Sequence, residues 1–360
     1  MISADPARDG IRCMLMRGGT SKGAYFLPED LPADARERDE LLLRIVGSPD
    51  PRQIDGIGGA HPLTSKVAIV TRSAEPGVDL DYLFLQLGVD EPTVSAAQTC
   101  GNLLAGVGPF GLERGLITAE AGVAAVRIRL LNTGDVATAR FAIAADGRVE
   151  YDGDAAIDGV PGTAGAVEIE MDGGKAKPVL PTGNLVDLLD GHEATLVDNG
   201  MPVVLLRAAD FGVTGDEPPA ELEARPGLHD AVERVRLAAG PLFGIEDVAG
   251  KTVPKMFLLS APRHGGAVST RAFIPARVHP SIGVLMAASV AAGIRIPGTV
   301  GSELARIPEG DAVPIEHPSG TFGALVRVGR NGEDWVSTYS ANLRTARKLF
   351  DGVVYARPRL

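Results

Sequence analysis

The sequence predicts an α+β protein of two similar lobes, and three observations carry this prediction. The chain has 360 residues, which corresponds to about two domains of ordinary size. Its 45 glycines and 26 prolines indicate many tight turns and short strands. Each half also has strand-like segments followed by an apolar helix of small residues, one opening at TCGN (99–102) and one at HPSIG (279–283). This repeated order is typical of two lobes with a core each.

In the first half, apolar runs bounded by turn residues predict the elements. A helix is expected at 36–46, with charges on one side, Leu41, Leu42, Ile45 and Val46 on the other, and Gly47 directly after it. A second helix is expected after Cys100, buried with neighbouring backbone close against it, although its glycines and Pro109 weaken its helix propensity. Strands are expected at 11–16, 66–73, 81–89, 126–132, 137–143, 149–151 and 166–171.

In the second half the same reasoning predicts two helices. One is a charged amphipathic helix over 219–239, and the other is a helix of small residues over 279–293. A turn-rich stretch at 180–189 indicates a boundary between the lobes. Residues 195–212 are expected to form a strand, a turn and a strand, and further strands are expected at 255–262, 268–275 and 315–328, before the closing segment 343–358.

Composition excludes several classes of function. The net charge of −11 argues against nucleic-acid binding, which needs clustered lysine and arginine. No apolar window approaches the roughly 20 residues of a membrane span, and residues 1–13 do not resemble a signal peptide. Cys13 and Cys100 are the only cysteines, so a reducing cytoplasm is the expected compartment. The six histidines show no metal-ligand spacing, and we expect no metal site.

Cys100 stands directly before the second predicted helix. The N–H groups and the positive dipole end of a helix favour a thiolate, and the same N–H groups can hold a carboxylate or enolate oxygen. A buried cysteine is also commonly a small apolar packing residue. The sequence leaves both interpretations open.

Two other segments of the first half also have two interpretations. Lys66 opens a predicted strand after GIGGAHPL (56–63); such a lysine is usually solvated, but beside a cleft its pKa can fall and it can act as a base. RGGTSKG (17–23) lacks the residue order of a phosphate-binding P-loop. It is either a simple turn or a carboxylate cradle, the latter formed by Arg17, Thr20, Ser21 and Lys22.

In the second half, Arg271 and the turn around Ser281 are the candidate residues. They are expected to meet the first-half residues across a cleft. The alternative is an arginine in an ion pair and an ordinary helix cap at Ser281.

Seven motifs, spread in order over nearly the whole chain, resemble the 4-oxalomesaconate tautomerase/isomerase family, which is close to the 2-methylaconitate isomerases. They are MRGGTSKGAYFLPEDLP, GSPDPRQIDGIGGAHPLTSKVAIV, CGNLLAGVGPF, DNGMPVV, VPKMFLLSAPR, HPSIGV and RTARKLFDGVVY. The resemblance implies a diaminopimelate-epimerase-like fold, with two pseudo-symmetric lobes that each wrap a mixed sheet around a central helix. It implies a first lobe of about 1–182 with a C-terminal return at 344–360, and a second lobe of 183–343 that closes the cleft.

The resemblance also implies cofactor-free proton transfer by Lys66 and Cys100. Lys66 is expected to be the base in its neutral form, although the reverse assignment is open. Epimerases of this fold use a cysteine from each lobe, and HPSIGV has none, which argues against a two-thiol racemase. The residues expected to bind the tricarboxylate substrate are Arg17, Thr20, Ser21, Lys22, Ser65, Gly101, Asn102, Asn184, Arg271 and Ser281.

The expected activity is a double-bond shift in 4-oxalomesaconate, in the catabolism of gallate, protocatechuate and other lignin-derived aromatic acids. The alternatives are a 2-methylaconitate cis/trans isomerase or a non-catalytic tricarboxylate-binding protein on the same scaffold. By analogy with the family, a homodimer is expected.

Overall fold

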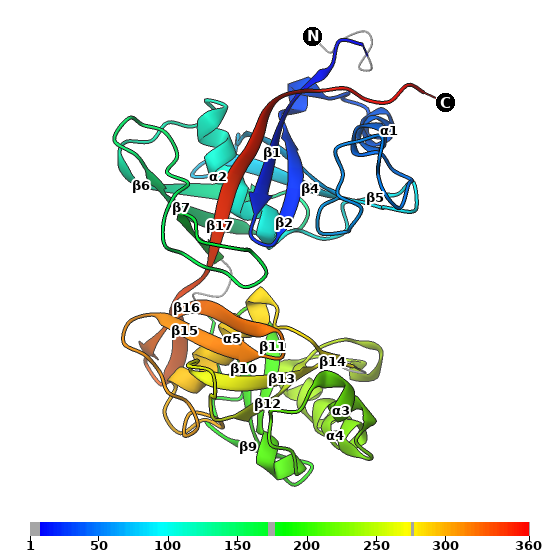
Figure 1. The fold of residues 1–360 in the computed structure, drawn as a ribbon. Helices are drawn as coiled ribbons and strands as arrows, with labels where there is room; N and C mark the ends of the chain where they lie inside the picture. Colours follow the sequence, from blue (N-terminus) through cyan, green and yellow to red (C-terminus); the bar gives the residue numbers. More distant parts are fainter. Residues whose placement is uncertain (1–7, 172–176, 275–276, 360) are drawn as a thin grey trace. The chain divides into compact units, whose positions relative to one another are not determined.

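A computed structural model describes residues 8–171, 177–274 and 277–359. The chain divides into two compact units, Met1–Asp172 with Leu343–Leu360, and Gly173–Asn342. The long strand β17 (Asp334–Val354) contributes its first part to the second unit and its last part to the first (Figure 1). Residues 178–182 lie in the second unit, whereas the sequence analysis assigns them to the first lobe.

The first unit is a closed mixed sheet. Its strands follow one another in the order β17–β1–β2–β3–β4–β6–β7–β8, and β8 pairs with β17 to close the circuit. The β2–β3 and β4–β6 pairs are parallel. The bounds are β1 (Ile11–Gly18), β2 (Ser21–Phe26), β3 (Lys66–Arg72), β4 (Leu80–Leu87), β5 (Val94–Ser95), β6 (Gly122–Leu130), β7 (Val136–Ile143) and β8 (Ala166–Met171).

Helix α2 (Gly101–Glu113) fills the interior of this sheet. It contacts seven strands, β1 to β4 and β6 to β8, and every residue from 103 to 111 is buried. A helix enclosed on all sides needs small residues where strands approach it. At Gly106 an added Cβ would lie 2.5 Å from Tyr25 Oη, and at Gly108 it would lie 2.5 Å from the Phe141 ring. These glycines weaken the helix propensity, but they let the helix fit inside the barrel.

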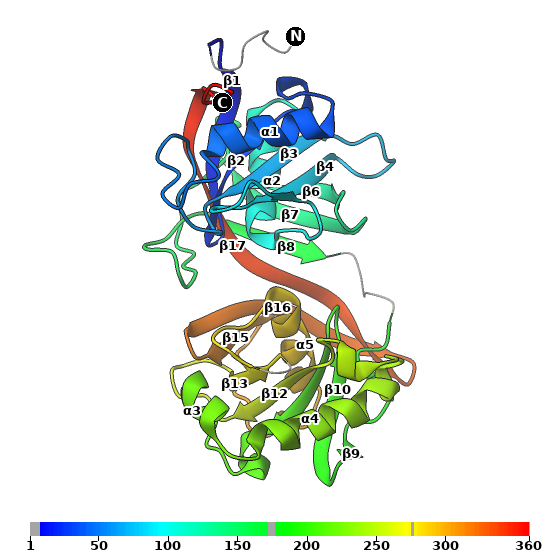
Figure 2. The ribbon, with the colours of Figure 1, turned by 90° about the vertical axis from the view of Figure 1, so that its right-hand side faces the viewer.

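Helix α1 (Ala35–Val46) covers the outside of the first sheet (Figure 2). Asp34 caps its N-terminus by accepting hydrogen bonds from the backbone N–H groups of Arg36 and Glu37. The helix ends at Gly47, whose φ of 92° is the left-handed conformation that favours glycine. The short helix η1 (Pro28–Asp30) precedes it.

The second unit has its own mixed sheet around helix α5 (Val284–Arg295), in which residues 286–294 are all buried. Its main sheet order is β10–β11–β12–β13–β15–β16–β17, with β9 beside β10 and β14 beside β13. The strands are β9 (Asp187–Leu189), β10 (His192–Asp198), β11 (Pro202–Arg207), β12 (Lys255–Ser260), β13 (Val268–Phe273), β14 (Val278–His279), β15 (Ala312–His317) and β16 (Gly320–Asn331). The remaining helices are η2 (Ala208–Phe211), α3 (Pro219–Ala224), α4 (Leu228–Ala239), η3 (Gly240–Phe243) and η4 (Val248–Gly250).

Most of the expected helices and strands are confirmed, and three expectations are wrong. The helix expected over 219–239 is broken into α3 and α4, because Pro226 lacks an N–H and Gly227 takes a φ of 76°. The helix expected from 279 begins only at Val284, with Gly283 as its N-cap in place of Ser281. The strand expected at 149–151 is a single bridge between Ile143 and Val149.

Among the residues that the structure describes, no helix has the length and apolarity needed to cross a membrane.

The close packing around α2 predicts that a larger residue at Gly106 lowers the stability of the fold. Gly106→Ala should lower the free energy of unfolding by about 1–3 kcal/mol through overpacking, although alanine is the better helix former. Tyr25 is fully buried and its hydroxyl donates to Leu103 O at 2.5 Å, so the ring cannot move away. Urea unfolding measures the change. Gly101→Ala is the matched control, because nothing lies within 4 Å of an added Cβ there. Equal stability of the two variants would contradict this packing.

Candidate functional site

The N-terminus of α2 lies against the turn between β1 and β2. An added Cβ at Gly18 would be 2.3 Å from Asn102 O, so only glycine lets helix and turn approach this closely. Cys100 is the N-cap residue, and its side chain makes no capping hydrogen bond. The first N–H groups of α2, those of Gly101 and Asn102 among them, are therefore left for a ligand. An added side chain at Gly101 would meet open space.

Main-chain contacts fix the position of Cys100. Its carbonyl oxygen accepts a hydrogen bond from Leu104 N at 3.0 Å and one from Tyr82 Oη at 3.3 Å. Just before it, Ala96 O accepts from Asn132 Nδ2, and the same amide group bonds both the N–H and the carbonyl of Phe84 on β4. The segment before the helix is thus tied to the sheet, and the thiol is half-buried at the rim of the core.

Lys66 is the first residue of β3 and is only 7% exposed. Its Nζ donates to Gln86 Oε1 and lies 5.1 Å from the centroid of the Phe84 ring. In the described part of the chain it contacts no carboxylate. Burial lowers the pKa of Lys66, and attraction to Cys100 opposes this in part. The lysine is therefore placed to lose its proton more readily than a solvated one.

A second buried cation influences Cys100. Arg344 on β17 is 8% exposed, and burial lowers its pKa to about 10, an effect that Cys100 opposes. Two tyrosines, Tyr25 and Tyr82, also interact with the thiol, and burial raises the pKa of each well above its usual value. Lys66, Cys100 and Arg344 thus form an electrostatic group whose negative member can only be the thiolate.

Three of the residues expected to bind substrate come together at the same place. Asn102 Nδ2 donates to Thr20 Oγ1 at 3.1 Å and lies 3.5 Å from Ser21 Oγ. These side chains and the N–H groups of Gly101 and Asn102 gather at the start of α2. Ser65 adjoins Lys66, but its hydroxyl is fully buried and bonds to Gln53 Oε1 and His61 O.

Arg17 and Lys22 lie apart from that group. Gly23 is in register with Lys66 and contacts Leu103 of α2, so Lys22 beside it points to the other face of the sheet. Arg17 is the cross-strand partner of Lys22 and shares that face. Its Nη1 donates to Gly19 O and to the carbonyl and hydroxyl of Thr345. The structure thus shows Arg17 bracing the turn that carries Thr20 and Ser21.

The other expected residues belong to the second unit. Asn184 is exposed and donates to Asp187 Oδ1 at 2.7 Å. The Ser281 N–H donates to His279 Nδ1 at 3.1 Å. Arg271 is 5% exposed, with Nε donating to Glu217 O and Nη1 to Thr270 O. Arg271 also lines a pocket of about 400 Å³ in this unit.

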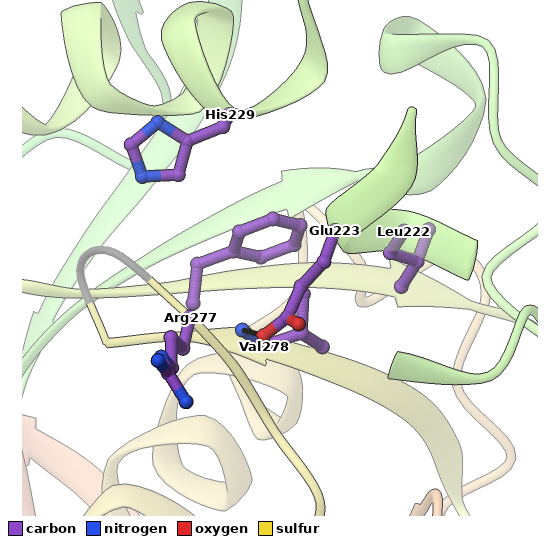
Figure 3. A pocket seen from close by; sticks show the side chains of 6 residues that line it. Leu222, Glu223, His229, Arg277 and Val278 are labelled. Atoms are coloured by element: carbon purple, nitrogen blue, oxygen red, sulfur yellow. Dashed lines mark hydrogen bonds between the residues drawn. The ribbon is translucent and has the colours of Figure 1, made fainter. Parts of the chain in front are cut away.

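Another pocket of the second unit contains none of the expected residues. It has a volume of about 420 Å³ and lies between α3, α4 and the β13–β14 region (Figure 3). Glu223 in its wall accepts a hydrogen bond from Val278 N at 3.1 Å, so this carboxylate links helix α3 to strand β14. The described residues include no group of three or more metal-ligating side chains.

Comparison with known proteins gives the family. Residues 9–357 match the model of the PrpF protein family. The chain belongs to the PrpF family. It is 52% identical to a (4E)-oxalomesaconate Δ-isomerase of Novosphingobium sp., with 99% of this chain and 100% of that protein covered. It is 53% identical to a 4-oxalomesaconate tautomerase of Pseudomonas putida, with 96% and 95% covered. The resemblance stated from the motifs is thereby confirmed.

Two solved structures share the fold of this PrpF chain. A methylitaconate Δ-isomerase superimposes with a TM-score of 0.84 at 32% identity, covering 96% of this chain and 95% of its own. A hydroxyproline epimerase from Agrobacterium vitis has a TM-score of 0.51 at 15% identity, covering 98% and 94%, and shows the shared fold alone. The fold is epimerase-like, as expected, while the pseudo-symmetry of the two lobes stays a prediction.

Sequence reasoning did not find Gln86 or Arg344. Gln86 stands in the apolar run LFLQLG, where a lone amide in a buried strand is the available signal. Arg344 is likewise a polar residue buried in a strand, here the strand β17 that closes the barrel. Without the strand register, the sequence does not connect Gln86 or Arg344 with Lys66 or Cys100.

The two cysteines of this PrpF protein should differ in reactivity. Cys13 is fully buried, and burial raises the pKa of its thiol to about 12, whereas Cys100 is half-buried at the rim of the core. Because the thiolate is the reactive form, iodoacetamide at neutral pH should alkylate the native protein once, at Cys100. Peptide mass spectrometry locates the label, and Cys100→Ala should take up none. Labelling of Cys13 at a similar rate in the native protein would contradict this.

Proposed function

We propose that the protein is a cofactor-independent isomerase that moves a double bond of 4-oxalomesaconate by 1,3-proton transfer. The proposal is carried by a buried lysine that interacts with a thiol at a helix N-terminus and that contacts no carboxylate among the described residues. The names of the two relatives above 50% identity support the substrate. A role in the catabolism of lignin-derived aromatic acids such as gallate and protocatechuate follows from that substrate.

The proposed reaction uses the two groups in sequence. Neutral Lys66 removes a proton from the CH2 carbon that lies between the ketone and the double bond. The electron pair of that C–H bond shifts along the conjugated system, and the Cys100 thiol gives its proton to the carbon at the other end. The step leaves an ammonium and a thiolate, and the return of one proton from Lys66 to Cys100 restores the resting state. Their mutual attraction stabilises the intermediate ion pair.

The dienolate formed between the two transfers needs donors aimed at its oxygens. The N–H groups of Gly101 and Asn102 at the start of α2 are fixed dipoles that cost no reorganisation. Thr20 supplies a hydroxyl from the β1–β2 turn and Ser21 supplies one from the start of β2, and their bonds to Asn102 hold them there. Arg344 adds positive charge close to the thiol. We assign the binding of one substrate carboxylate to this group.

Replacing either proton-transfer residue should abolish most turnover. Lys66→Met and Cys100→Ser should each lower kcat for 4-oxalomesaconate by about 10²–10⁴-fold, the usual contribution of a positioned acid or base. Absorbance and proton NMR follow the conversion, and circular dichroism confirms that the variants are folded. 2-Methylaconitate is tested beside 4-oxalomesaconate. Turnover of 2-methylaconitate alone would assign the protein to the other isomerase, and full activity of both variants would overturn the mechanism.

The rate should depend on pH in a direction set by Lys66. Only the neutral amine accepts a proton, so kcat/KM should rise with pH as Lys66 is deprotonated. Because burial lowers the pKa of Lys66, the midpoint of this rise should lie below the ordinary lysine value of 10.5. Initial rates at constant ionic strength, measured well above the carboxylic-acid range, give the midpoint. A rate that falls as pH rises from neutrality would contradict a lysine base.

A further inference from the structure

Gln86 is the direct cross-strand neighbour of Lys66 in the antiparallel pair of β3 and β4. Its amide oxygen accepts the hydrogen bond from Lys66 Nζ. Its Nε2 faces three backbone carbonyl oxygens, those of Pro62 and Ser65 at 3.1 Å and Leu87 at 3.2 Å. Because carbonyl groups only accept, the amide is held with its oxygen toward Lys66.

The chemistry of this partner matters for a lysine base. A carboxylate in the same place would form an ion pair and favour the charged ammonium. An amide oxygen accepts a hydrogen bond from the neutral amine as well as from the ammonium, and it carries no charge. The contact can therefore direct Nζ without holding a proton on it.

The other groups that surround Lys66 do not replace this role. The titratable group that interacts with Lys66 is Cys100, at the N-cap of α2, and Arg344 on β17 interacts with the same thiol. Tyr25 on β2 and Tyr82 on β4 lie in the same core and stay neutral. His61 in the preceding loop is exposed, and its Nδ1 accepts from Leu63 N. None of these groups is a carboxylate.

We propose that Gln86 is the positioning residue of the base: it directs Lys66 Nζ and, because it is an uncharged acceptor, lets the amine lose its proton. The proposal rests on the proposed function in one respect, namely that Lys66 takes a proton from the substrate. Gln86 itself acts through Lys66.

The test compares two substitutions at one position. Gln86→Glu has nearly the same shape but places a carboxylate against Nζ. The ascending limb of kcat/KM against pH should therefore move to higher pH by about 1–3 units. At neutral pH this corresponds to a loss of about 10-fold or more, recovered at higher pH. Gln86→Met removes the acceptor and adds no charge, so kcat should fall while the midpoint of the pH profile does not move to higher pH. Gln98→Glu, at an exposed position, is the control for added charge and should leave the limb in place.

A second readout does not need turnover. The chain has seven lysines, so protein labelled with ¹³C at lysine Cε gives few NMR signals, and Lys66→Met assigns that of Lys66. The signal should titrate at higher pH in Gln86→Glu than in the parent protein. An unmoved titration and an unmoved limb would overturn the role of Gln86, as would parental kcat in Gln86→Met. A raised titration in a protein that converts neither tricarboxylate would uphold the contact and overturn the proposed function.

Discussion

The close approach of helix α2 to the strands around it is the constraint on which the site depends. The helix is enclosed by seven strands, and glycines stand where Tyr25, Phe141 and the β1–β2 turn come nearest. At its N-terminus this packing sets Cys100, the first N–H groups and Asn102 against Gly18. The barrel closes through β17, which also brings Arg344 to the thiol. A looser helix would leave the same residues present but not aligned.

Electrostatics then give the aligned groups their chemistry. Burial disfavours the ammonium of Lys66, and the described residues that interact with it supply an amide, an aromatic ring and a thiol. Proton transfer from carbon needs this imbalance, since a lysine in a full ion pair is a poor base. The second cation, Arg344, adds positive charge that interacts with Cys100. The PrpF relatives are named for isomerisations of unsaturated acids, and this arrangement suits such a reaction.

Local sequence patterns predicted the parts of the fold that local interactions decide. The capped helix at 36–46 and the small-residue helix after Cys100 could both be read from periodicity and turn residues. Pro226 and Gly227 indicate a helix break in the sequence, but the charged amphipathic pattern around them favours one continuous helix. The faces of Arg17 and Lys22 follow from strand register, and the contact of Gln86 with Lys66 depends on it too. Register is set by tertiary packing and cannot be read from one segment.

The central claim is that Lys66 removes the substrate proton and Cys100 supplies the new one. Proton NMR in deuterium oxide with 4-oxalomesaconate tests it most directly, using the parent protein, Lys66→Met and Cys100→Ser. We expect deuterium at the carbon that gains the proton in the parent product. We also expect exchange of the abstracted proton without isomerisation in Cys100→Ser, and no exchange in Lys66→Met. Exchange at the parental rate in Lys66→Met would show that Lys66 is not the base.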